Sequence, residues 1–87
     1  MNDLEEAKDT VKYVIGRLWQ NAMYIKDELK QCENEKQQKF LEGVLHGYWE
    51  VFDTLTNEVD LQDVDPDDIG FYYDLKELDY TPKALAV

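Results

Sequence analysis

The single histidine of this 87-residue chain lies among carboxylates at helical spacing. His46 has Glu42 four residues before it and Glu50 four residues after it, so on a helix the three side chains share one face. A stable zinc or di-iron site usually takes three or four ligands, with further histidines that this chain lacks. We therefore interpret His46 as a surface histidine, and we expect no metal and no other cofactor.

Aspartates alternate between residues 63 and 74 in the manner of a calcium-binding loop. Counting from Asp63, the sixth position is Asp68, where such a loop needs glycine for its sharp turn. The fourth is Pro66, and the twelfth is Asp74 instead of the longer glutamate. We interpret these aspartates as residues that open short helices, and weak calcium binding remains an alternative.

Nucleophilic catalysis requires a base beside its nucleophile, and the chain offers only Cys32 and His46 for these roles. We expect Cys32 in a connection between two helices and His46 within the second helix, so they do not form a pair. The sequence has no glycine-rich phosphate loop either. We predict that the protein is not an enzyme and has no catalytic residues.

Acidic residues dominate the second half of the chain. The whole sequence has 20 Asp and Glu against 9 Lys and Arg, a net charge of −11. Residues 1–40 contain eight acids and seven bases, whereas the stretch between Lys39 and Lys76 contains ten carboxylates and no base. We expect these carboxylates to face solvent without bases that neutralise them. Phosphate groups bind surfaces of the opposite sign, so direct contact with nucleic acid is disfavoured.

Several of these acids fall on one flank of the helix predicted over residues 35–60, at 100° per residue. Trp49 lies among them as a large aromatic on an otherwise negative surface. Two interpretations remain open: the flank binds a partner, or it is only solvated and Trp49 packs under the C-terminal segment. The residues predicted to bind a partner are Glu42, His46, Trp49, Glu50, Asp53, Asp60, Asp63, Asp67, Asp68 and Tyr72.

The leading functional hypothesis is a non-catalytic protein–protein interaction module whose acidic side docks on a basic surface of another protein. A nucleic-acid-binding protein is the suggested partner, because the module would occupy its phosphate track as a nucleic-acid mimic and inhibit it. Trp49, Tyr72 or Tyr73 would supply the buried anchor. The alternative is a structural or assembly protein that self-associates as a helical bundle, with a homodimer as its simplest form.

The first helix is predicted over residues 3–31. Asn2 and Glu5 form a capping-box pattern at its start. Apolar residues then follow in steps of three and four, and only Lys8 interrupts them. This predicted seam consists of Leu4, Val11, Ile15, Leu18, Ala22, Ile25, Leu29 and Cys32.

The apolar phase fails after Cys32, which predicts a turn near residues 32–35. Asn34 is a suitable N-cap for a second helix over residues 35–60, and Gln37 follows three residues later. Two helices joined by so short a turn form an antiparallel hairpin. The seam of the second helix consists of Leu41, Leu45, Tyr48, Phe52, Leu55 and Val59.

Two such seams leave apolar flanks that another element must cover. The candidate is a helical segment around residues 66–79, which Asp65-Pro66 opens and Gly70 interrupts. Its residues Phe71, Leu75 and Leu78 are spaced for one helical face. The flanks to be covered are Val14, Trp19, Met23, Phe40, Val44 and Val51.

Gly43 and Gly47 form a GxxxG spacing and sit on neither face of the predicted core. In a membrane this spacing would indicate close helix contact. In this chain we expect it to let an aromatic side chain of the C-terminal segment lie close to the helix backbone.

Together these elements predict an all-α fold, a long antiparallel helical hairpin closed by a short C-terminal helical segment. At this length we expect one domain over residues 1–80, followed by a flexible tail over residues 81–87. The longest apolar runs are a few residues, MNDLEEAKD does not resemble a signal peptide, and a single cysteine cannot form an internal disulfide. We therefore expect a cytoplasmic protein that does not enter a membrane.

In general layout the chain, with FLEGVLHGYWEVFDTL as its most distinctive stretch, resembles small acidic helical proteins of bacterial phages and mobile elements. The resemblance implies that the protein, as the inhibitor proposed above, comes from a phage or a mobile element. The chain also resembles, in outline, the secreted helical-hairpin proteins of the WXG type. Its turn, CENE, lacks their Trp-x-Gly signature, so export is not inferred.

Overall fold

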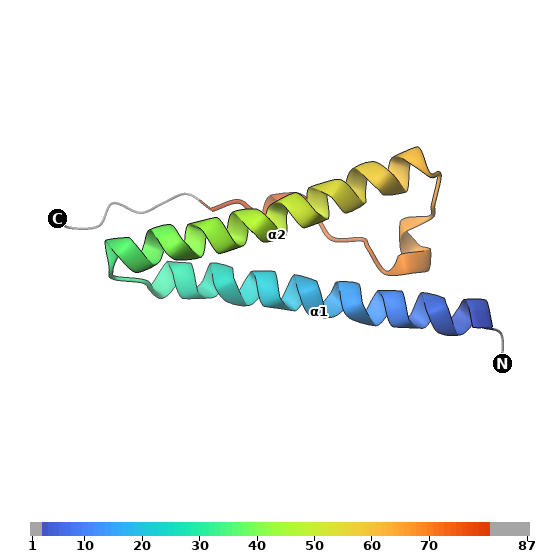
Figure 1. Cartoon of the computed structure of the whole chain (residues 1–87), viewed down its shortest axis with the longest axis horizontal. Helices are drawn as coiled ribbons and strands as arrows, with labels where there is room; N and C mark the ends of the chain where they lie inside the picture. The colour runs from blue at the N-terminus through green and yellow to red at the C-terminus, as the bar shows by residue number, and fades with distance from the viewer. Residues whose placement is uncertain (1–2, 81–87) are drawn as a thin grey trace.

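The predicted hairpin is present in the computed structural model, which describes residues 3–80 (Figure 1). Helix α1 spans Asp3–Gln31 and helix α2 spans Glu35–Leu61, and the two run antiparallel. Two single turns of 3-10 helix follow, η1 over Pro66–Ile69 and η2 over Leu75–Leu78. The all-α fold and the helical hairpin are therefore confirmed.

The predicted N-cap Asn2 and the predicted tail over residues 81–87 lie outside the described residues. Within residues 3–80, no helix is both long enough and apolar enough to cross a lipid bilayer.

The turn between the helices has the cap that its sequence predicts. The backbone N–H of Gln37 donates to Oδ1 of Asn34 at 3.0 Å, which pairs one of the N–H groups that a first helical turn leaves free. Cys32 is buried beside the turn, and its thiol donates to the carbonyl oxygen of Asn34 at 3.2 Å. Local hydrogen bonds therefore define where the chain reverses.

Aspartates open both turns of the C-terminal segment, as their position in the sequence suggested. The carboxylate of Asp65 accepts the backbone N–H of Asp67 at 3.0 Å at the start of η1. The carboxylate of Asp74 accepts the backbone N–H of Lys76 at the same distance at the start of η2. Two of the aspartates in the calcium-like pattern thus act as helix caps.

Gly70 separates the two turns, and residues 71–74 have no regular secondary structure. Gly70 ends η1 in the left-handed conformation, with φ at 68°. As a result, Phe71 reaches the core from the irregular stretch after η1 and Leu78 reaches it from η2, so the two residues do not share one continuous helical face. The segment around residues 66–79 is therefore helical only in part.

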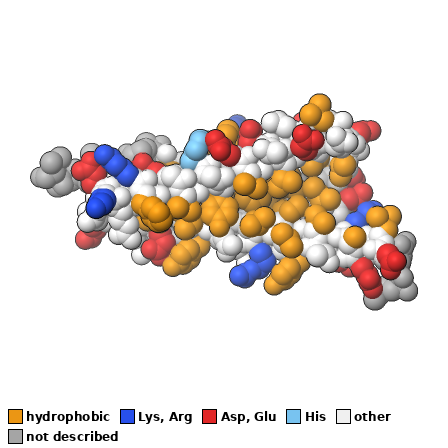
Figure 2. Space-filling view, in the orientation of Figure 1, with side chains coloured by type: hydrophobic (Ala, Val, Ile, Leu, Met, Phe, Trp, Pro, Cys, Tyr) orange, Lys and Arg blue, Asp and Glu red, His pale blue; other side chains and the backbone are white. Residues whose placement is uncertain are grey.

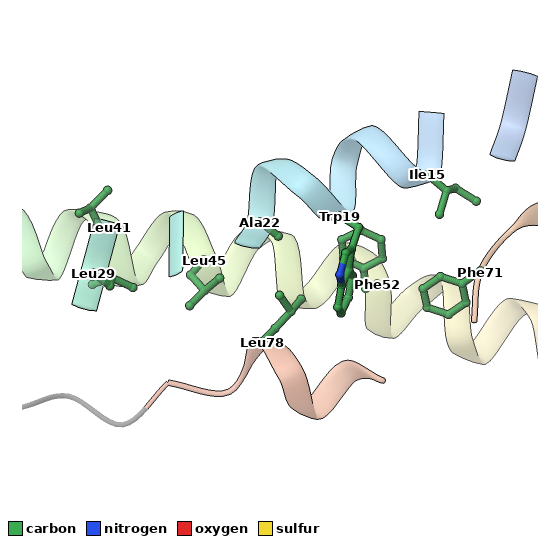
Figure 3. Packing of buried hydrophobic residues seen from close by; sticks show 9 residues of the cluster. All are labelled: Ile15, Trp19, Ala22, Leu29, Leu41, Leu45, Phe52, Phe71 and Leu78. Atoms are coloured by element: carbon green, nitrogen blue, oxygen red, sulfur yellow. The ribbon is translucent and has the colours of Figure 1, made fainter. Parts of the chain in front are cut away.

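The core lies between the hairpin and the C-terminal segment, and Trp19 is at its centre (Figure 3). The Trp19 ring stacks on Tyr73 with centroids 4.5 Å apart and meets Phe52 edge-on at 5.1 Å. The prediction that the C-terminal segment covers Trp19 is thus confirmed. The buried cluster consists of Ile15, Trp19, Ala22, Leu29, Leu41, Leu45, Phe52, Phe71 and Leu78.

The predicted seam of α1 is not buried at its N-terminal end, where Leu4 and Val11 are exposed. In Figure 1, α2 diverges from α1 toward this end, and η1 packs against α1 instead. Lys8 pairs there with Asp68 of η1, with Nζ and Oδ2 3.8 Å apart. Lys8, which interrupts the apolar pattern, therefore lies where η1, and not α2, packs against α1.

The C-terminal segment covers only one face of the hairpin. Phe40 and Val51 are 69% and 47% exposed, and Val14 is exposed as well. The expectation that this segment covers them is wrong, because the flank of α2 that it approaches is the opposite one, around Trp49.

Gly43 and Gly47 also lie away from the C-terminal segment. A Cβ atom built on either glycine would meet no atom within 4 Å, which contradicts the predicted approach of an aromatic side chain. It is Gly16 of α1 that has such a neighbour, since a Cβ atom added there would lie 3.8 Å from Oη of Tyr73.

Candidate functional site

A hollow of about 330 Å³ lies where the end of the C-terminal segment meets the middle of α2. We call it the Trp49 hollow. It is open to solvent and brings together two aromatic rings, two carboxylates and a histidine. Its lining residues are Glu42, Leu45, His46, Trp49, Leu78, Asp79 and Tyr80.

Helix α2 supplies one wall of the hollow, and hydrogen bonds at helical spacing hold its polar side chains. Oε1 of Glu42 accepts a hydrogen bond from Nε2 of Gln38 at 3.0 Å. Nε2 of His46 lies 3.1 Å from Oε1 of Glu50, and the His46 ring lies parallel to that of Trp49 with centroids 6.0 Å apart. Trp49 is half-buried, whereas His46 is exposed. The indole therefore has one side against the core and another toward the hollow.

The other wall comes from the residues around the end of η2. Leu78 is only 2% exposed and belongs to the core, so it attaches this part of the chain to the hairpin (Figure 3). The Tyr80 hydroxyl donates to the backbone carbonyl of Leu29 in α1 at 3.5 Å. Between these two anchored residues, Asp79 is exposed. The hollow is therefore lined by α2 and by the end of the C-terminal segment, which Tyr80 ties to α1.

The composition of the hollow suits a cationic group. Aromatic faces attract cations, and planar guanidinium groups stack on them while donating hydrogen bonds to carboxylates. Trp49 and Tyr80 provide the rings, and Glu42 and Asp79 provide the carboxylates.

The predicted partner-binding residues fall into groups instead of one continuous ridge. Glu42, His46 and Trp49 line the hollow, and Glu50 contacts His46. Asp53 is half-buried farther along α2, and Tyr72 is exposed beside Tyr73. The remaining four are exposed at the end of the molecule where α2 leads into η1, and they are Asp60, Asp63, Asp67 and Asp68.

Lysines of α1 approach the acidic C-terminal segment. Lys8 pairs with Asp68, and Nζ of Lys26 donates to the backbone carbonyl of Glu77. We expected no base to neutralise the carboxylates between Lys39 and Lys76. This expectation is wrong for Asp68, which pairs with a lysine of the first forty residues. The reason is that the segment runs along the flank of α1 on which Lys8, Lys12 and Lys26 lie at helical spacing.

No group of three or more histidines, cysteines, aspartates and glutamates within residues 3–80 is arranged to hold a metal ion. Cys32 is buried at the hairpin turn, while His46 is exposed on α2 and contacts Glu50. The two side chains considered for nucleophilic chemistry thus lie in different parts of the fold.

Sequence reasoning missed Asp79 and Tyr80, which complete the hollow. The signal for them was weak: an acid and an aromatic residue directly follow Leu78, the last apolar residue assigned to the C-terminal segment. That local pattern does not indicate which part of α2 Asp79 and Tyr80 approach, because Trp49 is thirty residues earlier in the chain.

Comparison of the chain with protein-family models, with curated proteins and with solved structures finds no match.

Proposed function

We propose that the protein is a non-catalytic acidic interaction module that binds a basic surface of another protein through the Trp49 hollow. The observation that supports this proposal is the pairing of aromatic rings with carboxylates in one open hollow. An arginine side chain of the partner would stack on Trp49 or Tyr80 and donate hydrogen bonds to Glu42 or Asp79. Such an inserted side chain is the kind of anchor that carries most of the free energy of binding in protein interfaces.

The net charge of −11 supports a strongly basic partner. The carboxylates at the η1 end of the molecule would add long-range attraction, which speeds association and weakens as salt is added. The partner class that we propose is a nucleic-acid-binding protein, whose phosphate-binding track this protein would occupy as a nucleic-acid mimic. It would inhibit this partner by competing with nucleic acid. The general layout of the chain suggests that such an inhibitor comes from a phage or a mobile element.

Affinity capture from the protein's own cell, loaded at low salt and eluted with a salt gradient, tests the partner class. We expect a basic nucleic-acid-binding protein that free DNA or RNA displaces. If no basic protein is retained at low salt, the proposal fails.

Charge-neutralising variants of the module, measured against the captured partner, test the site itself. Glu42→Gln with Asp79→Asn removes both carboxylates of the hollow, and the glutamine introduced at position 42 would keep a hydrogen-bonding side chain beside Gln38. We expect Kd to rise about tenfold, which corresponds to about 1.4 kcal/mol.

The matched control is Asp9→Asn with Glu33→Gln, which changes the net charge equally at exposed positions outside the hollow. We expect less than about a threefold change in Kd for it, because exposed charges contribute little individually. Equal effects of the two pairs would show that only net charge matters. A second check is Glu50→Lys with Asp53→Lys, and unchanged binding would contradict docking through this flank.

The alternative, a structural or assembly protein that self-associates, is favoured by a different observation. Phe40, Val51 and Val14 leave apolar surface exposed on the face that the C-terminal segment does not cover. Particle size separates the two functions only beyond the dimer, because a docking module can also be dimeric, whereas an assembly protein that adds further copies forms species that grow with concentration.

A further inference from the structure

One stripe of α2 has no partner element among residues 3–80. Its seven residues follow each other in steps of four, three, four, four, three and four, and all of them are exposed. At 100° per residue they fall within about 80° of one another on the helix and point away from the core residues Leu45 and Phe52. The stripe residues are Lys36, Phe40, Gly43, Gly47, Val51, Thr54 and Glu58.

This stripe borders the face of the hairpin that the C-terminal segment leaves uncovered, which we call the open face. In Figure 1, the part of the C-terminal segment around η2 passes behind α2, so the open face is turned toward the viewer. In the same orientation, Figure 2 shows hydrophobic side chains along the line between α1 and α2. Helical spacing places Val14, Leu18 and Ile25 of α1 on the same face, and all three are at least partly exposed.

The spacing of the stripe is the same in both directions from Gly47, so two antiparallel copies of α2 can match it about a two-fold axis. In that arrangement Val51 of each copy meets Gly43 of the other, and Phe40 meets Thr54. At each end Lys36 faces Glu58 of the second copy, so opposite charges pair twice. No atom lies within 4 Å of a Cβ built on Gly43 or Gly47, which leaves the central positions open to close approach by a second helix.

The charge distribution is compatible with such a contact although each chain carries −11. The stripe holds one base and one acid and is neutral. Glu42 and Asp79 line the Trp49 hollow on the side of the hairpin that the C-terminal segment covers, so they would face away from the second copy.

The size of the open face is adequate for a stable contact. Two helices of about 40 Å, about 10 Å apart, present a face of about 800 Å² per copy, or about 1,600 Å² in total, the usual size of a specific interface. We infer that a second copy of this chain covers the open face, with the α2 helices antiparallel and Gly47 at the two-fold axis. This inference does not depend on the Trp49 hollow.

A charge swap tests the predicted pairing of Lys36 with Glu58. The two residues are about 33 Å apart along one helix, so they can meet only between copies. Sedimentation equilibrium of the full chain between about 1 µM and about 1 mM should show a closed dimer. Lys36→Glu alone and Glu58→Lys alone should each raise the dimer Kd about tenfold, and the double variant should restore it to within about threefold.

Gly47→Gln provides the steric test. It should abolish the dimer over the same range of concentration while unfolding no more easily than the wild type at monomeric concentrations, because Gln is a better helix former than Gly at an open helical position. The inference is overturned by a wild-type chain that is monomeric at about 1 mM, by a dimer that tolerates Gly47→Gln, or by a charge swap that does not restore association.

Discussion

At the residue scale, Gly70 has the strictest structural requirement among the glycines. Its φ of 68° is unfavourable for any residue with a Cβ atom, and such an atom would lie 3.0 Å from Cγ of Lys12 and 3.3 Å from its Cα. The residue also ends η1, where its backbone N–H donates to the carbonyl of Asp67 and that of Phe71 donates to the carbonyl of Pro66. Gly70 thus directs the chain back toward the hairpin.

Gly70→Ala should lower the free energy of unfolding by about 2 kcal/mol, because strain in the left-handed region and the close contact with Lys12 add together. Urea denaturation followed by circular dichroism measures the change. Gly16→Ala is the matched control, since that Cβ would make an ordinary contact of 3.8 Å with Oη of Tyr73. It should leave stability unchanged or raise it by up to about 1 kcal/mol. Similar effects of both substitutions would contradict the assigned role of Gly70.

At the element scale, the C-terminal segment depends on the hairpin for its structure. Each of its helices is a single turn of four residues, too short to be stable alone. Capping aspartates define where the turns begin, but burial of Phe71 and Leu78 and the hydrogen bond from Lys26 to Glu77 attach the segment to α1 and α2. The Trp49 hollow therefore exists only while η2 is docked.

Leu78→Ala should reduce stability by about 2–4 kcal/mol, as expected when a large buried side chain is truncated. It should also shift the emission of Trp49 toward longer wavelength under native conditions, because the hollow opens to water. Fluorescence in a Trp19→Phe background isolates the Trp49 signal. Glu77→Gln, an exposed neighbour, should change stability by less than about 0.5 kcal/mol. Unchanged Trp49 emission in Leu78→Ala would show that η2 does not close the hollow.

At the scale of the whole molecule, a thin fold carries a large excess of one charge. The ion pairs between Lys8 and Asp68 and between Lys39 and Glu35 are substantially exposed. Exposed pairs contribute little to stability, whereas repulsion among the excess acids acts across the molecule. The net electrostatic contribution to folding should therefore be unfavourable at low salt.

Raising sodium chloride from about 20 mM to about 500 mM should raise Tm by about 4–8 °C, which corresponds to about 1 kcal/mol for a domain of this size. Thermal unfolding at low protein concentration keeps dimer formation from contributing. The variant Asp63→Asn with Asp67→Asn, which has two fewer negative charges, should respond less. A Tm that falls with salt would mean that attraction between charges outweighs repulsion.

The amino-acid sequence by itself determined the two long helices, the turn at Asn34 and the break at Gly70. Helices depend on hydrogen bonds between residues four apart, and caps and glycine breaks act within a few residues, so their signals are local. The acidic flank around Trp49 could be predicted for the same reason, since it follows from spacing along one helix.

Only the tertiary structure decided which face of the hairpin the C-terminal segment covers. Residues 62–74 include turns and stretches without regular structure, so no periodic pattern indicates the path of the chain. That path pairs Lys8 with Asp68, joins Trp49 to Tyr80 across the hollow and leaves Phe40 and Val51 exposed. These contacts connect residues far apart in the sequence, and packing of the whole core selects them.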